Sequence, residues 1–246
     1  MNPDPAAPQE GGVRSTGSPA TDGWGVPLHP SDPQQLGPYR LSRRLGAGGM
    51  ATVYLGRDGA GREAAVKVVR ADLVGDPGFA ARLVREVNVL RGVTSPAVAR
   101  VLDADASGDP VWLAVEFVPG ESLAAAVDAR GPLPLAYWSV LTGQLLEAVA
   151  ALHEAGVVHR DLTPGNVVLG PDGPKIIDFG IALSDLSTRV TQTGHAVGTP
   201  GWMAPEQLDG RVVSSAADVY SAGCLLAHAA TGRPPHGTGT RQEVVH

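Results

Sequence analysis

Residues 157–169 read VVHRDLTPGNVVL, a polar segment between two short apolar runs. The apolar runs are typical of buried strands, whereas unpartnered polar groups cost free energy inside a core. The segment is therefore either an ordinary turn, in which side chains bond the backbone, or a reacting centre. Its polar residues are His159, Arg160, Asp161, Thr163 and Asn166. The stretches on either side of it have to decide between the two interpretations.

Composition limits the class of protein. The 246 residues are 43% hydrophobic and 18% charged, which is enough for one large domain or two modest lobes. The formal net charge of −6 gives no basic field toward nucleic acid or anionic lipid, so we expect no nucleic-acid partner. The single cysteine, Cys224, excludes an internal disulfide and a cysteine-based zinc cluster, and we expect it to be a small buried residue.

The sequence also bears on location. No run of about 18 uninterrupted apolar residues occurs, so we expect no membrane span in this chain. The N-terminus lacks the basic and apolar regions of a secretory signal. We therefore expect a cytoplasmic chain, with a membrane tether in a longer parent chain left open.

Three regions differ in pattern. Residues 1–38 are rich in Pro and Gly and poor in large apolar residues, which predicts a flexible tail. Residues 39–118 predict five short antiparallel strands and one helix, whose apolar face carries residues at helical spacing. That face consists of Phe79, Leu83, Val87 and Leu90. The first lobe is therefore expected to be a small β lobe.

Residues 119–246 predict a second, mainly helical lobe. Residues 121–131 and 135–156 read as helices that end at Gly, and residues 216–232 as another mostly apolar helix. The long middle helix carries an apolar stripe of Leu141, Leu145, Val149 and Leu152. The expected fold class is α+β, with two lobes of unequal character.

The first lobe contains a glycine-rich stretch, LGAGGMATV, at residues 45–53. Gly46, Gly48 and Gly49 lie between two strand-like runs, where absent side chains let backbone N–H groups approach a phosphate. A plain glycine hairpin is the alternative interpretation. A dinucleotide-binding turn opens a helix and a P-loop carries Gly-Lys-Ser/Thr, and neither feature follows here.

Lys67 is the only charged residue of the apolar stretch AAVKVV, residues 64–69. A buried ammonium group is costly unless an anion is close to it. Glu86, on the helix face expected to pack on that strand, offers one partner, and a nucleotide phosphate offers another. A solvated helix carboxylate is the ordinary alternative for Glu86.

Oxygen-bearing side chains follow at two neighbouring loops. Asp161 and Asn166 come after the long helix, and Asp178 follows the short run PKII. Three such side chains suit Mg²⁺, which proteins hold with a few oxygens together with substrate phosphates. Each loop on its own is also consistent with a turn or a helix cap.

Seven stretches, taken in order, resemble the signature set of eukaryotic-type protein kinases in the version of the bacterial Ser/Thr enzymes. The resemblance covers residues 39–246. The stretches are GAGGMATV, AVK, a helix Glu, HRDLTPGN, DFG, GTPGWMAPE and DVYSAG. It implies a bilobal protein kinase fold, with a first lobe of about 39–118 and a second of about 119–246.

The resemblance also implies roles for single residues. Lys67, tied to Glu86, would bind the ATP phosphates, while Asp178 and Asn166 would hold Mg²⁺, with Mn²⁺ as an alternative ion. Asp161 would orient the substrate hydroxyl and accept its proton. The implied ATP site consists of Leu45, Gly46, Ala47, Gly48, Gly49, Val53, Ala65, Lys67, Val115, Glu116, Val118 and Val168.

Regulation is implied as well. Arg160, beside the implied catalytic Asp, would pair with a phosphate in the activation segment, because Arg–phosphate pairing can order a loop. Thr191 and Thr193 are the candidate autophosphorylation sites, and a flexible polar loop is the alternative there.

Three features depart from the family pattern. Ala51 replaces the third glycine of the phosphate loop, a change that we expect to be tolerated. Thr163 stands where Ser/Thr kinases usually have Lys, which predicts slow turnover. Family members continue beyond residues 231–246 through further helices, so we expect a fragment or an incomplete second lobe, with Glu206 lacking its usual arginine partner.

The expected function is an ATP- and Mg²⁺-dependent protein kinase that acts on Ser/Thr of protein substrates and self-associates for autophosphorylation. The alternative is a catalytically weak or inactive pseudokinase that serves as a regulatory binding module. A small-molecule phosphotransferase of kinase-like fold is disfavoured, because GTPGWMAPE resembles a segment that docks peptide substrates.

Overall fold

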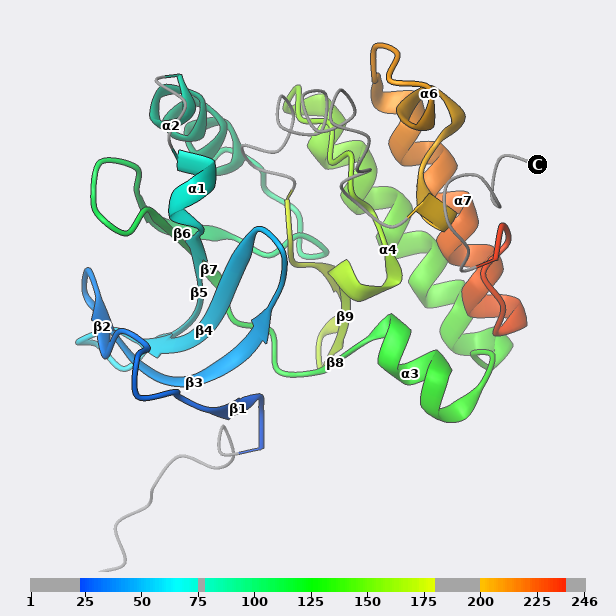
Figure 1. The fold of residues 1–246 in the computed structure, drawn as a ribbon. Coiled ribbons are helices and arrows are strands. Elements are labelled where there is room, and N and C mark those ends of the chain that lie inside the picture. Colours follow the sequence, from blue (N-terminus) through cyan, green and yellow to red (C-terminus); the bar gives the residue numbers. More distant parts are fainter. Residues whose placement is uncertain (1–22, 75–77, 180–199, 238–246) are drawn as a thin grey trace, which may run out of the picture.

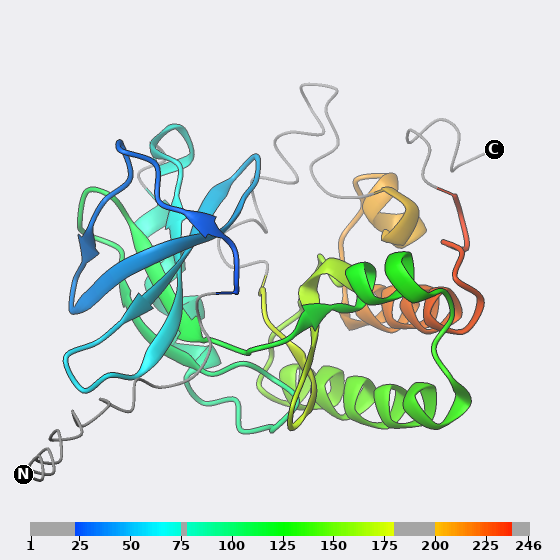
Figure 2. The ribbon, with the colours of Figure 1, turned by 90° about the horizontal axis from the view of Figure 1, so that it is seen from below.

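The computed structural model describes residues 23–74, 78–179 and 200–237. A β-rich lobe and a helical lobe lie side by side, and Figures 1 and 2 show the sheet apart from the long helices in both views. The expected α+β fold with two lobes is confirmed. Thr191 and Thr193 lie outside the described residues.

The first lobe is built on one antiparallel sheet in the order β1-β3-β4-β5-β7-β6, in which β1 (Val26–Pro27) and β2 (Gln35–Leu36) both pair with β3. Its strands within the predicted region are β3 (Tyr39–Ala47), β4 (Ala51–Arg57), β5 (Glu63–Val69), β6 (Val101–Asp105) and β7 (Trp112–Glu116). These are the five strands that the sequence predicted. They place Lys67 in the middle of the sheet, opposite Leu113 of β7.

Two helices accompany this sheet. The predicted one is α2 (Phe79–Leu90), and its four buried residues are those of the predicted apolar face. A short helix, α1 (Ala71–Val74), precedes it and was not predicted.

The second lobe contains four described α-helices. They are α3 (Leu123–Arg130), α4 (Leu135–Glu154), α6 (Pro205–Leu208) and α7 (Ser215–Thr231). Local chemistry sets their ends, since Ser122 caps α3 through its hydroxyl and the left-handed Gly232 terminates α7. The predicted stripe of α4 is buried, and α4 packs against α7. Short strands β8 (Glu121–Ser122), β9 (Val167–Gly170) and β10 (Gly173–Ile176) form a second small sheet.

Among the described residues, α4 is long and apolar enough to cross a membrane by length and composition alone. Core helices commonly have the same length and composition, so this is weak evidence for a span. Five residues of α4 are buried within the helical lobe, whereas Leu135, Val140 and Leu146 of the same helix are exposed.

One continuous apolar cluster joins the lobes. It includes Leu83 of α2, Leu113 of β7, Leu145 of α4, Val167 of β9 and Phe179. Backbone hydrogen bonds between the segment after α2 and the end of β10 reinforce the junction, from Ala99 N–H to the Ile176 carbonyl and back from Ile176 N–H to the Ala97 carbonyl. This junction fixes the segment that leads into Asp178.

The predicted flexible tail is wrong over residues 23–38. Strands β1 (Val26–Pro27) and β2 (Gln35–Leu36) both pair with β3, so this segment extends the sheet to seven strands. Composition was misleading here, because a few backbone pairs and one buried carboxylate hold a segment that has little apolar surface of its own.

Candidate active site

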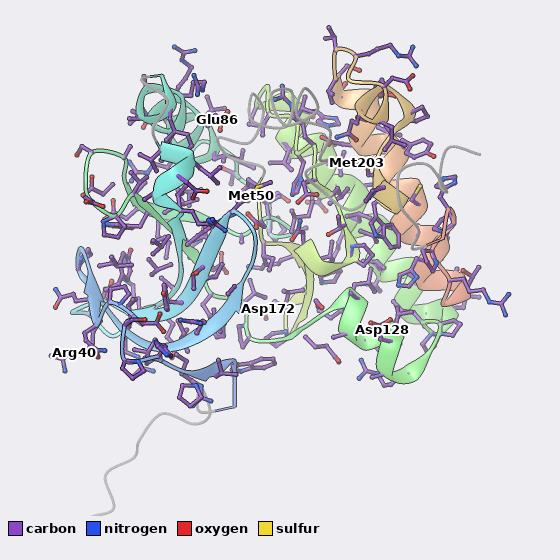
Figure 3. The ribbon with its side chains drawn as sticks, viewed as in Figure 1. Arg40, Met50, Glu86, Asp128, Asp172 and Met203 are labelled. Carbon is purple, nitrogen blue, oxygen red and sulfur yellow. The ribbon has the colours of Figure 1, made fainter. Side chains whose placement is uncertain are left out.

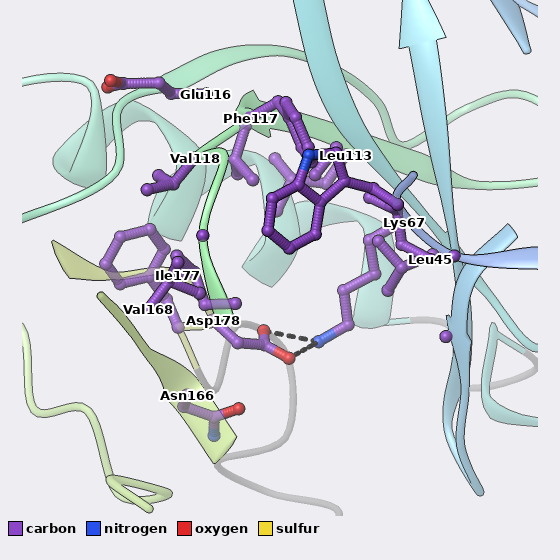
Figure 4. A pocket seen from close by; sticks show the side chains of 18 residues that line it. Leu45, Lys67, Leu113, Glu116, Phe117, Val118, Asn166, Val168, Ile177 and Asp178 are labelled. Atoms are coloured by element: carbon purple, nitrogen blue, oxygen red, sulfur yellow. Dashed lines mark hydrogen bonds and ion pairs between the residues drawn. The ribbon is translucent and has the colours of Figure 1, made fainter. Parts of the chain in front are cut away.

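A pocket of about 340 Å³ opens between the sheet and the loops of the helical lobe (Figure 4). Most of the residues implied for nucleotide binding line it. They are Leu45, Gly46, Val53, Ala65, Lys67, Val115, Glu116, Val118 and Val168, together with Asn166 and Asp178. The wall is largely aliphatic, with the polar groups Lys67, Asn166 and Asp178 gathered in one part of it, as ligand pockets commonly are.

Three of the residues implied for nucleotide binding do not line this pocket. Ala47, Gly48 and Gly49 are exposed at the tip of the hairpin between β3 and β4. The Gly48 N–H donates to the Ala51 carbonyl at 2.9 Å, which closes the turn. Open space surrounds Gly48 and Gly49, since a Cβ added at either would meet no atom closer than 3.9 Å. A phosphate could therefore approach the backbone of the hairpin closely.

The segment after β7 supplies backbone groups to the pocket. The Val118 N–H donates no hydrogen bond to another described residue, so a ligand can accept it. The Glu116 carboxylate instead bonds Lys175 at 2.6 Å and Arg100, and Figure 4 shows it pointing away from Lys67. Burial is the largest single influence on the pKa of Glu116 and raises it, but the hydrogen bonds from Lys175 and Arg100 and the charge of Lys175 together leave the pKa below its usual value.

Lys67 and Asp178 form an ion pair at the polar end. The Lys67 ammonium lies 2.6 and 2.8 Å from the two carboxylate oxygens of Asp178 (Figure 4). The implied tie between Lys67 and Glu86 is therefore not what the structure has, although Glu86 does lie on α2 as predicted (Figure 3). The reason is tertiary: the partner of a buried ammonium depends on how α2 and the segment after β10 pack on β5, which local spacing does not determine.

Asp161 and Asn166 meet within the predicted polar segment. The Asn166 amide donates to the Asp161 carbonyl at 2.8 Å and to its carboxylate at 3.3 Å. The Asn166 carbonyl accepts from the Ile177 N–H at 3.0 Å, which places Asn166 beside the residue before Asp178. Burial, and next the charge of Asp178, raise the pKa of Asp161 to about 6. Such a carboxyl can hold or release a proton near neutral pH.

A buried carboxylate from α7 holds the polar segment in shape. Asp218 accepts hydrogen bonds from the N–H groups of His159 and Arg160, both at 2.8 Å, and lies 2.8 Å from His153. On the other side, the Gln207 amide donates to the Arg160 carbonyl at 2.7 Å. Arg160 has a φ of 67°, the only positive φ of a non-glycine residue in the described chain. Bonds to both sides of this residue offset the cost of that conformation.

The other polar residues of segment 157–169 are His159, Arg160 and Thr163, and each has a different environment. His159 is buried against Phe179, and burial lowers the pKa of its imidazole. The Arg160 Nε is buried without a hydrogen-bond partner among the described residues. Thr163 is half-buried before the short 3-10 turn Pro164–Asn166, and its hydroxyl makes no hydrogen bond there.

The donor set fits a magnesium ion completed by a ligand. The described residues contain no group of three or more His, Cys, Asp or Glu side chains placed to hold a metal. Asn166 and Asp178 face the polar end of the pocket, and this pair of oxygen donors is typical of Mg²⁺ sites that substrate phosphates and water complete. A metal held by protein groups alone would need more ligands.

Sequence reasoning missed several residues of the site. Trp24 and Gly25 line the pocket, although they were assigned to the tail, and so do Phe117 and Phe179. Trp24 is the one large aromatic residue in its stretch, which was the available signal. Asp218 was noted only within DVYSAG, and nothing local indicates that it bonds residues 58 and 59 positions earlier.

Known proteins match this chain over most of its length. The family model described as "Protein kinase domain" matches residues 39–246. The probable serine/threonine-protein kinase PkwA of Thermomonospora curvata is 46% identical over 219 residues, which cover 89% of this chain and 30% of that protein. The serine/threonine-protein kinase AfsK of Streptomyces coelicolor is 46% identical over 215 residues, 87% of this chain and 27% of that protein. The chain thus spans less than a third of the length of these relatives.

A solved structure is similar as well. The PknI kinase domain of Mycobacterium tuberculosis, crystallised as its C20A mutant, superposes with a TM-score of 0.66 at 28% sequence identity. The match covers 83% of this chain and 76% of that one.

Proposed function

The chain belongs to the protein kinase domain family, and from this premise we propose that it transfers the γ-phosphoryl group of ATP to Ser or Thr hydroxyls of proteins. Its relatives are named serine/threonine-protein kinases, which supports the choice of hydroxyl. We include in the proposal a dependence on Mg²⁺, with Mn²⁺ as an alternative, and autophosphorylation through self-association.

One observation carries the proposal. Lys67, Asn166 and Asp178 converge at the polar end of one apolar pocket, and Asn166 binds Asp161 directly. These side chains come from β5, from the segment after α4 and from the segment after β10. Phosphoryl transfer asks mainly for positioning and charge neutralisation, which such a cluster provides.

The chemical roles follow from the side chains. Asp161 would accept the proton of the incoming hydroxyl, and its raised pKa suits a base near neutral pH. Lys67 would leave Asp178 and neutralise charge on the phosphates. A bound Mg²⁺, held by Asn166 and Asp178, would supply further charge neutralisation when present.

Arg160 supports a regulatory role. Its buried Nε has no partner among the described residues, which leaves a donor for a phosphate group. Thr191 and Thr193 remain the candidate phosphorylation sites. Location in the cytoplasm remains a prediction from the sequence.

A second candidate function is a binding module without turnover. The ion pair between Lys67 and Asp178 favours a binding module, because the two groups bind each other. The pair must separate before Lys67 can bind phosphate and Asp178 can bind a metal ion. Thr163 favours a binding module also, because a hydroxyl cannot neutralise charge as a lysine would.

The test is direct. The purified chain is incubated with labelled ATP and Mg²⁺ beside Asp161→Asn, and the labelled residues are located by mass spectrometry. We expect label on Ser or Thr of the wild-type chain, including Thr191 or Thr193, and none with the variant. Folded wild-type protein that stays unlabelled but binds nucleotide would instead establish the binding module.

A further inference from the structure

Trp24 lies at the wall of the pocket, far from the rest of the site in sequence. Its indole meets the Phe117 ring edge-on, with centroids 6.5 Å apart and planes at 70°. Both residues line the pocket together with Leu45, while the polar groups that suit phosphates lie around Lys67. Since Phe117 directly follows Glu116, Trp24 lies at the end of the pocket implied for the base.

The backbone on each side of Trp24 is fixed. Arg43 Nε donates to the Trp24 carbonyl at 2.7 Å, and the same guanidinium donates to the Gly25 carbonyl at 3.0 Å. Gly25 has a φ of +71°, and a Cβ there would lie 2.2 Å from the Arg44 carbonyl oxygen. The chain therefore needs glycine at this position to approach β3 so closely.

A second anchor lies eight residues later. Asp32 is buried and accepts hydrogen bonds from the His29 N–H at 2.7 Å, the Tyr54 hydroxyl at 2.9 Å and Arg44 at 2.5 Å. Breaking a buried, multiply bonded carboxylate is costly, so this anchor holds residues 23–36, the N-terminal strap, against β3 and β4. These are the strands that flank the glycine hairpin.

We propose that Trp24 is a nucleotide-contacting residue, whose indole forms part of the wall for the adenine base and is held there by the N-terminal strap. The inference rests on the proposed function, because it assumes that this pocket binds a purine nucleotide. Indole offers a flat, polarisable surface, and aromatic contact with a base stabilises binding whatever the base's hydrogen bonds. Phe117 and the aliphatic residues Leu45 and Val118 line the same pocket.

The experiment compares three variants by calorimetry with ADP and Mg²⁺. We expect Trp24→Ala to raise the Kd for ADP about tenfold, the loss of roughly one aromatic contact. Trp24→Phe keeps an aromatic ring and should stay within about threefold of wild type. Val26→Ala should leave the Kd unchanged, because Val26 lies in the same strap but is 57% exposed and does not line the pocket.

Inorganic pyrophosphate serves as the second ligand, because it lacks a base. Trp24→Ala should not change its affinity. A loss of equal size for ADP and pyrophosphate overturns the inference, since Trp24 would then act on the whole site. Tighter ADP binding by Trp24→Ala overturns it too, because the indole would then occupy the space of the base.

Fluorescence keeps the inference testable if Trp24→Ala fails to fold. The chain has four tryptophans, and Trp24 alone among them lines the pocket. ADP should change the emission of the wild-type chain, and Trp24→Phe should abolish most of that change. An unaltered response in Trp24→Phe overturns the inference, whereas a wild-type chain that binds no nucleotide overturns the proposed function and the inference together.

Discussion

The Lys67 ammonium lies between both carboxylate oxygens of Asp178, at 2.6 and 2.8 Å. The pair joins the sheet of one lobe to the segment that follows the small sheet of the other. Its side chains are 19% and 35% exposed, so solvent only partly screens the attraction. Phosphate and Mg²⁺ must compete with this pair, because Lys67 and Asp178 both line the pocket.

Replacing Lys67 tests this arrangement most simply. We expect Lys67→Met to lower the rate of phosphoryl transfer by roughly 10²–10³, because one preorganised cation is lost. The chain has only two lysines, so Lys175→Met is a natural control. Lys175 also pairs with a carboxylate, that of Glu116, but away from Asp178. Initial rates with labelled ATP give the comparison, and equal losses in the two variants would contradict a special role for Lys67.

The raised pKa of Asp161 makes the free energy of unfolding depend on pH. Its folded pKa of about 6 lies above the ordinary value of 3.8, so the folded state binds this proton more tightly than the unfolded chain. This contribution favours the folded state below pH 4 and is lost as pH rises through 6. Asp161→Asn removes the penalty, and we expect it to raise the free energy of unfolding at pH 7 by on the order of 1–3 kcal/mol.

Urea denaturation of Asp161→Asn and wild type at pH 7 and pH 4 measures this effect. The gain should shrink toward zero at the lower pH. Asp172→Asn is the control, because Asp172 is exposed in the turn between β9 and β10 (Figure 3). A gain that is the same at both pH values would show that packing, not ionisation, stabilises the variant.

Local patterns predicted much of the fold. The apolar faces of α2 and α4 appear at the expected positions because helical periodicity depends only on neighbouring residues. The strands that hold Val53, Lys67 and Val115 followed from the same local reasoning. Nine of the twelve residues implied for nucleotide binding line the pocket, and their roles there stay a prediction.

Contacts between distant residues were not predictable in this way. The N-terminal strap depends on Asp32 meeting Arg44 and Tyr54, which no pattern in residues 1–38 indicates. Which carboxylate pairs with Lys67 depends on how α2 and the segment after β10 pack on β5. The φ of Arg160 depends on Asp218, 58 residues later, and on Gln207.

Asp218 should be essential for the shape of the catalytic segment. Asp218→Asn keeps one acceptor oxygen but turns an N–H₂ toward N–H donors, so we expect a loss of about 2–4 kcal/mol in stability. The rate of phosphoryl transfer should fall more than the affinity for ATP, because Asp161 moves while the pocket stays. Denaturation and steady-state kinetics measure both effects. Asp209→Asn, at an exposed ion pair with Arg211, is the control, and a wild-type rate in Asp218→Asn would contradict this role.

We expect a substitution at Thr163 to raise the rate of phosphoryl transfer. Thr163 is half-buried two residues after Asp161, and its hydroxyl makes no hydrogen bond to another described residue, so a longer side chain breaks none there. A lysine at this position would bring a positive charge toward the transferring phosphate, and we expect Thr163→Lys to raise the initial rate by up to roughly 10². Thr163→Met matches the length of lysine without its charge and should not exceed the wild-type rate. If Lys and Met have the same effect, the charge at residue 163 does not limit turnover, and the slow rate expected from Thr163 has no basis.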